Sequence, residues 1–110
     1  MAKINPIVVK KIKKYIADIS SICPIDKAVL FGSYAKGTQV EDSDIDIAVF
    51  SREIDDSNRH KYMSLFLKHI LKYKLDIQPV AFSLKDYDSQ LDKFITDEIK
   101  KKGTVVFSKR

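Results

Sequence analysis

Two short apolar runs in the first half of the chain are separated by a connection that begins with a glycine. The first, "DKAVLFG" at residues 26–32, is continuously apolar and stops at Gly32, which predicts a buried β-strand. The second, "SDIDIAVFS" at residues 43–51, begins by alternating polar and apolar side chains, which predicts another strand. A fold available to this chain must therefore contain a sheet built around these two segments.

Helical periodicity appears before, between and after the apolar runs. Asn5 as N-cap and Pro6 at the first helical position predict the start of a helix that Pro24 ends. Residues 56–73 carry the clearest helical stripe, with candidate caps at Asp55, Asp56 and Ser57. Residues 89–102 predict a last helix. Its apolar positions are Leu91, Phe94, Ile95 and Ile99, and Gly103 closes it.

Two further strands complete the predicted sheet. Residues 75–83 predict a third strand, in which Pro79 indicates a bulge, an edge position or an early end. Residues 104–108 predict a fourth. The order α-β-β-α-β-α-β predicts an α/β (α+β) fold with a mixed sheet of about four strands flanked by helices. At 110 residues, we expect the chain to form a single domain spanning 1–110.

The composition is that of an ordinary globular protein with an excess of lysine. The net charge is +5, and the lysines gather at residues 10–14, at 100–102 and at the C-terminus. They indicate either solvated helix faces or a surface for an acidic partner, and no aromatic residues interleave with them to suggest a nucleic-acid groove. No apolar run is long enough to span a membrane, and the N-terminus lacks a signal peptide pattern, so we expect a cytoplasmic protein.

Two aspartates in the second predicted strand are candidates for a metal-binding site. Asp44 and Asp46 are two residues apart, so on a strand they share a face, with Cα atoms about 6–7 Å apart. Carboxylates at this spacing can converge on a hard cation such as Mg²⁺. The alternative is that both simply face water, although aspartate is a poor strand former.

The turn after the first strand is a candidate phosphate site. Gly32 allows a ligand close to the backbone, and Ser33 can cap a short helical turn whose free N–H groups bind anions. An ordinary strand-to-helix turn is the alternative, and the segment is neither a Walker A loop nor a dinucleotide-binding glycine motif. Asp76, in "KLDIQPVAF", is a candidate third carboxylate if its strand lies beside Asp44 and Asp46.

Taken together, these residues resemble the nucleotidyltransferase superfamily signature. Gly32-Ser33 is followed by ten residues and then by Asp44-Ile45-Asp46, and Asp76 stands where that family carries its third acidic residue. The short chain is similar to the minimal nucleotidyltransferase (MNT) type. The resemblance implies a polymerase-β-like nucleotidyltransferase fold for the whole chain.

The resemblance also implies an activity and a set of roles. Asp44, Asp46 and Asp76 would bind two Mg²⁺ ions, about 3.5–4 Å apart in such sites. Gly32 and Ser33 would bind the phosphates of ATP, and Lys36 is a further candidate for a triphosphate contact. The expected reaction transfers AMP from ATP to a hydroxyl of a partner protein. That partner would be a HEPN-domain toxin, for which this chain would be the antitoxin.

Two other functions are compatible with the sequence. The same chemistry could act on a small molecule such as an aminoglycoside, although nothing in the chain suggests an acceptor-binding domain. Alternatively, the chain could neutralise its partner by binding alone, with the carboxylates unused.

Overall fold

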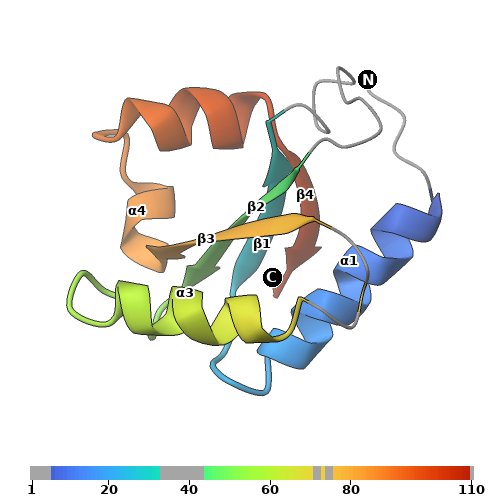
Figure 1. Cartoon of the computed structure of the whole chain (residues 1–110). Coiled ribbons are helices and arrows are strands. Elements are labelled where there is room, and N and C mark those ends of the chain that lie inside the picture. The colour runs from blue at the N-terminus through green and yellow to red at the C-terminus, as the bar shows by residue number, and fades with distance from the viewer. Residues whose placement is uncertain (1–5, 33–43, 71–72, 74–75, 110) are drawn as a thin grey trace.

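The computed structural model describes residues 6–32, 44–70, 73 and 76–109. Four strands form one mixed sheet in the order β3-β2-β1-β4 (Figure 1). The central pair, β1 and β2, is antiparallel, β4 pairs antiparallel with β1, and β3 pairs parallel with β2. The strands are β1 (Lys27–Phe31), β2 (Ile45–Ser51), β3 (Ile77–Ser83) and β4 (Thr104–Ser108). The predicted mixed sheet of four strands is confirmed.

Helices cover both faces of this sheet (Figure 1). On one face, α1 (Pro6–Ile19) and α3 (Arg59–Lys68) pack over the buried isoleucines of β2. On the other face, α4 (Leu84–Asp88) and helix η2 (Ile95–Lys101), which has π-helical hydrogen bonding, cover a second apolar cluster. None of the helices in the described segments combines the length and hydropathy needed to cross a bilayer.

A buried tyrosine hydroxyl connects α1 to α3 by a hydrogen bond. Tyr15 on α1 donates a hydrogen bond of 2.8 Å to the backbone oxygen of Phe66 on α3, and both side chains are fully buried. Burial raises the pKa of the Tyr15 hydroxyl far above its ordinary value, so it remains a donor at all working pH values. Cys23 is also buried in the core under α1 and α3, as a free thiol.

Strand β3 lies at one edge of the sheet, where Pro79 is tolerated. Pro79 faces Ile47 of β2 in the parallel register, and β3 has no second neighbour in the described part of the sheet. A proline has no N–H to donate, so an edge strand is where a sheet accommodates it. Of the three possibilities that Pro79 left open, the edge position is the one found.

The predicted helix boundaries need two corrections. Helix α3 spans Arg59–Lys68 rather than 56–73. It starts late because the Asp55 carboxylate accepts the N–H groups of Ser57 and Asn58 in a preceding turn, and it ends early, with His69 as its C-cap. The helix expected at 89–102 is wrong at its start. Residues 84–88 form the short helix α4 instead, capped by Ser83, and Leu91 is 93% exposed rather than buried.

Gly103, after η2, should be sensitive to substitution. A Cβ at this position would lie 2.6 Å from Cγ1 of Val29 and 3.0 Å from the Leu30 oxygen, and would overlap the Ile99 oxygen. Since backbone atoms cannot move aside, we expect Gly103→Ala to lower the free energy of unfolding by about 1–3 kcal/mol in urea titrations. Lys101→Ala, which removes only an exposed pair with Asp97, should cost at most about 0.5 kcal/mol. Equal stability of the two variants would contradict this packing.

Candidate active site

The alternation of β2 places Asp46 on the face opposite the buried isoleucines. Ile45 and Ile47 point into the core under α1 and α3, whereas Asp46 shares the other face with Ala48 and Phe50. Asp46 is half-buried, and Asp44, directly before the strand, is exposed. Because Asp44 lies outside β2, the shared face of the two aspartates stays a prediction.

Gly32 is packed directly against Asp46. Its backbone φ is +77°, a conformation that residues other than glycine rarely adopt. A Cβ at this position would overlap Oδ2 of Asp46 and lie 3.3 Å from its Cγ. Strand β1 therefore ends in a glycine whose missing side chain makes room for the Asp46 carboxylate.

The two carboxylates form an electrostatically unfavourable pair. Burial raises the pKa of Asp46, and the negative charge of Asp44 raises it further. No lysine or arginine in the described segments forms an ion pair with either carboxylate. Oxygen donors of this kind, close together and not ion-paired to any cation among the described residues, are those that Mg²⁺ accepts from a protein. The residues present thus fit the expected metal.

The parallel pairing of β2 with β3 brings Asp76 to the same end of the sheet. Ile77 is the Cα partner of Ile45, and the Ile45 N–H donates a 2.7 Å hydrogen bond to the backbone carbonyl oxygen of Asp76. Ile77 points into the same core as Ile45, so Asp76 lies on the face that carries Asp46. Within the described residues, however, no three acidic, histidine or cysteine side chains approach closely enough to form a preformed metal cage.

Ser33 and Lys36, the other two expected phosphate-binding residues, lie outside the described residues. The helical turn expected after Ser33 lies in the same segment. Gly32, Asp44, Asp46 and Asp76 are the expected site residues that the structure describes. Of these, Gly32, Asp44 and Asp46 lie together, with Asp76 on the neighbouring strand end.

Gln78 is one residue near the carboxylates that the sequence did not single out. It is the Cα partner of Asp46, is exposed, and shares the face of Asp76. The period-two spacing from Asp76 was the signal that could have identified it. A polar side chain here is available to a ligand held at the carboxylates.

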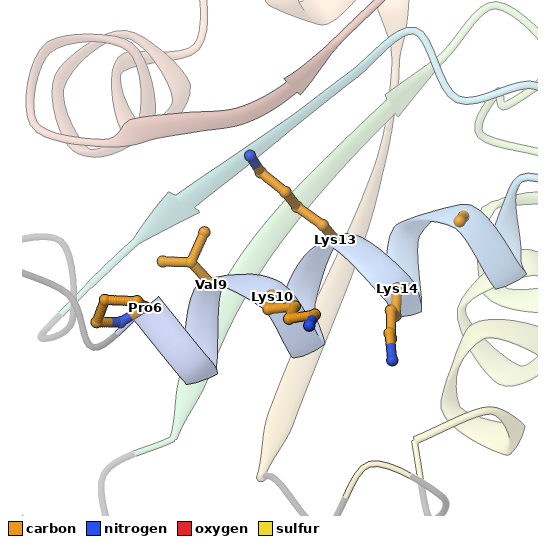
Figure 2. A pocket seen from close by; sticks show the side chains of 6 residues that line it. Pro6, Val9, Lys10, Lys13 and Lys14 are labelled. Atoms are coloured by element: carbon orange, nitrogen blue, oxygen red, sulfur yellow. The ribbon is translucent and has the colours of Figure 1, made fainter.

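A large open cavity lies elsewhere on the molecule. Its volume is about 700 Å³, and it runs along α1, with the lining side chains shown in Figure 2. They are Pro6, Val9, Lys10, Lys13, Lys14 and Ala17. Helix α1 covers the sheet face opposite to Asp46, so this cavity is not part of the carboxylate site.

Known proteins are similar to this chain in sequence and in fold. A protein of Methanocaldococcus jannaschii named as a protein adenylyltransferase is 29% identical over 102 residues, 90% of this chain and 98% of its own length. A crystal structure of a toxin–antitoxin with AMP-PNP contains a chain that is 26% identical, with a TM-score of 0.62, over 93% of this chain and 74% of that chain.

A third likeness concerns the fold alone. It is to a chain of the complex between a tri-AMPylated HEPN toxin of Shewanella oneidensis and an MNT antitoxin, at 22% identity. The TM-score is 0.53, over 91% of this chain and 69% of that chain. The family model described as polymerase beta, nucleotidyltransferase matches residues 10–110. This chain is therefore a member of the polymerase beta nucleotidyltransferase family.

Proposed function

We propose that this protein is a magnesium-dependent adenylyltransferase that transfers AMP from ATP to a hydroxyl of a partner protein. The observation that carries the proposal is the packing of Gly32 against Asp46, next to Asp44. A glycine with positive φ that makes room for a half-buried carboxylate does not improve the packing of the core. The same arrangement lets a metal-bound triphosphate approach the backbone closely.

The proposed partner is a HEPN-domain toxin, with this chain acting as its antitoxin. In support, the chain is 26% identical to a chain of a toxin–antitoxin structure that contains the ATP analogue AMP-PNP. A relative that covers nearly the same length is named as a protein adenylyltransferase. We further propose that residues 1–110 act as one minimal nucleotidyltransferase domain.

Each residue of the site has a proposed role in this reaction. Asp44, Asp46 and Asp76 would hold Mg²⁺, whose chemistry is to neutralise the charge that develops on the phosphates. Gly32 and Ser33 would hold the β- and γ-phosphates through backbone N–H groups, with Lys36 beside them. These contacts would leave the α-phosphate as the part of ATP that faces the acceptor.

Asp76 would position the acceptor and take its proton. The acceptor oxygen forms a bond to the α-phosphorus, the bond from that phosphorus to the bridging oxygen breaks, and pyrophosphate leaves. The hydroxyl proton passes to the Asp76 carboxylate, which is exposed and so accessible to an acceptor. Orientation of the two reactants and neutralisation of charge would supply most of the rate.

Radioactive label distinguishes this transfer from other reactions. The protein is incubated with Mg²⁺, a HEPN-domain partner and ATP labelled on either the α- or the γ-phosphate. We expect label on the partner only from α-labelled ATP. Label from γ-labelled ATP would indicate phosphorylation, and label on an added aminoglycoside but not on the protein partner would indicate a small-molecule enzyme. Either result would contradict the proposal.

Asp76→Asn should separate acceptor activation from nucleotide binding. We expect the turnover rate to fall about a hundredfold, because the proton acceptor is lost, while the affinity for AMP-PNP falls much less, because Asp44 and Asp46 remain to hold Mg²⁺. Asp56→Asn changes an exposed aspartate beyond the far end of β2 and is the matched control, expected to keep full activity. Full activity of Asp76→Asn would remove Asp76 from the reaction.

A further inference from the structure

Two large apolar side chains are exposed in the segment that leads from α4 into η2. Leu91 is 93% exposed and Phe94 is 48% exposed. The Phe94 ring packs against Phe31 with 5.7 Å between the ring centroids, whereas Leu91 is almost wholly exposed. The two residues therefore differ in what they lie next to.

Phe31 connects Phe94 to the carboxylate site. Phe31 is the last residue of β1 and the Cα partner of Asp46, so the two side chains lie next to each other on the same face of the sheet. Gly32, which makes room for Asp46, follows Phe31 directly. A single aromatic ring thus separates Phe94 from the proposed phosphate and metal site.

The geometry of the ring pair leaves a flat apolar surface open. The rings of Phe31 and Phe94 meet edge to face at 87°, so Phe31 leaves at least one face of Phe94 uncovered. Phe31 itself is only 7% exposed, whereas almost half of Phe94 remains accessible. Flat aromatic faces of this kind are the surfaces on which nucleobases stack.

The backbone holds Phe94 in place. The Asp92 carboxylate accepts the N–H of Phe94 at 2.9 Å and that of Ile95 at 3.2 Å. Ile95, the next residue, is fully buried in the second core. Capping on one side and burial on the other hold the backbone that carries the Phe94 ring.

We propose that Phe94 is the stacking platform for the nucleobase of the nucleotide whose phosphates bind at Gly32, Asp44 and Asp46. This inference rests on the proposed function and extends it to the other end of the nucleotide. Every base has an aromatic face, so Phe94 supplies affinity for a purine without selecting adenine. The platform therefore serves AMP-PNP and GMP-PNP alike.

A tryptophan at this position reports on stacking directly. The chain has five tyrosines but no tryptophan, so Phe94→Trp introduces a single tryptophan that can be excited selectively. We expect AMP-PNP with Mg²⁺ to quench its fluorescence in a saturable manner, and tripolyphosphate with Mg²⁺ to leave it unchanged. Leu91→Trp, three residues earlier and fully accessible, is the matched control and should not be quenched at the same AMP-PNP concentrations.

Affinities provide the second readout. By calorimetry, we expect Phe94→Ala to weaken AMP-PNP binding about tenfold and to leave tripolyphosphate binding unchanged, because only the base loses its contact. Phe94→Tyr, which keeps the aromatic face, should retain the AMP-PNP affinity. Leu91→Ala should retain both affinities.

Several results would overturn the platform. Unchanged AMP-PNP affinity in Phe94→Ala, or equal wild-type affinity for AMP-PNP and tripolyphosphate, would show that the base makes no such contact. Loss of partner binding in Phe94→Ala without nucleotide, with AMP-PNP affinity intact, would make Phe94 a protein-docking residue instead. A wild-type protein that binds neither ligand would overturn the proposed function as well. Phe94-dependent AMP-PNP binding without label transfer would uphold the platform and contradict the transferase proposal.

Discussion

Replacing either Asp44, directly before β2, or Asp46, within it, should abolish nucleotidyl transfer while leaving the fold intact. We expect Asp44→Asn and Asp46→Asn each to lower the rate of label transfer at least about a thousandfold. The reason is that phosphoryl-type transfers depend mainly on charge neutralisation and orientation, and an amide is a much weaker ligand for Mg²⁺ than a carboxylate. The measurement is transfer of α-labelled phosphate to the partner, with Asp56→Asn as the control.

In the absence of metal, Asp46→Asn should be more stable than the wild type, although it is less active. Burial and the charge of Asp44 raise the pKa of Asp46, so the ionised carboxylate destabilises the folded state at neutral pH. Thermal melts in EDTA should therefore show Asp46→Asn to be more stable than wild type at pH 7. The difference should vanish below the ordinary aspartate pKa of about 3.9, where both side chains are neutral. A loss of stability at pH 7 would assign Asp46 a structural role.

The same variants separate catalysis from simple binding. An antitoxin that acts by AMP transfer should lose its ability to neutralise the partner when Asp44 or Asp46 is replaced. Neutralisation that survives both substitutions, with no label transferred at any stage, would show that binding alone is sufficient. In that case the arrangement of Gly32 and Asp46 would be unrelated to how the partner is controlled.

Gly32→Ala should damage both the site and the fold. The φ of +77° costs an L-residue about 1–2 kcal/mol, and the added methyl group must displace the Asp46 carboxylate that it would overlap. A shift of about 1 Å in a catalytic group can cost a hundredfold in rate, so we expect transfer to fall at least that far. Urea titration and label transfer on the same preparation measure the two effects.

Gly103→Ala is the matched control for this substitution. It adds the same methyl group to another tightly packed glycine, but its close neighbours are Ile99, Val29 and Leu30 rather than a carboxylate. We expect Gly103→Ala to lose stability and keep its affinity for AMP-PNP, and Gly32→Ala to lose both. Equal AMP-PNP affinities in the two variants would show that Gly32 has no special place in the site.

The sheet and the positions of the carboxylates could be predicted because local patterns determine them. The apolar run that ends at Gly32 and the alternation around Asp44 and Asp46 gave both central strands, and the face of Asp46 followed from period two. That Asp76 joins this face depends on the parallel register of Ile45 with Ile77. Register across a helical crossover is a tertiary property, so the sequence supported Asp76 only conditionally.

The segment around Leu91 could not be predicted from apolar periodicity. Leu91 fits the stripe of a helix over 89–102, but side-chain caps at Ser83 and Asp92 begin two separate helices, α4 and η2, and Leu91 lies between them. Both caps have a signal in the sequence. Ser83 stands three residues before Asp86, and Asp92 stands two residues before the apolar pair Phe94 and Ile95. Leu91, which lies between the two helices, is exposed rather than part of a buried stripe.

A crystal structure of the protein with Mn²⁺ in place of Mg²⁺ and with AMP-PNP tests the central claim most directly, because manganese is located by its anomalous scattering. We predict metal bound by the carboxylates of Asp44 and Asp46, with Asp76 facing the same metal and the phosphates against Gly32. Nucleotide bound in the cavity along α1, or metal bound away from Asp44 and Asp46, would contradict the assignment of this strand end as the active site.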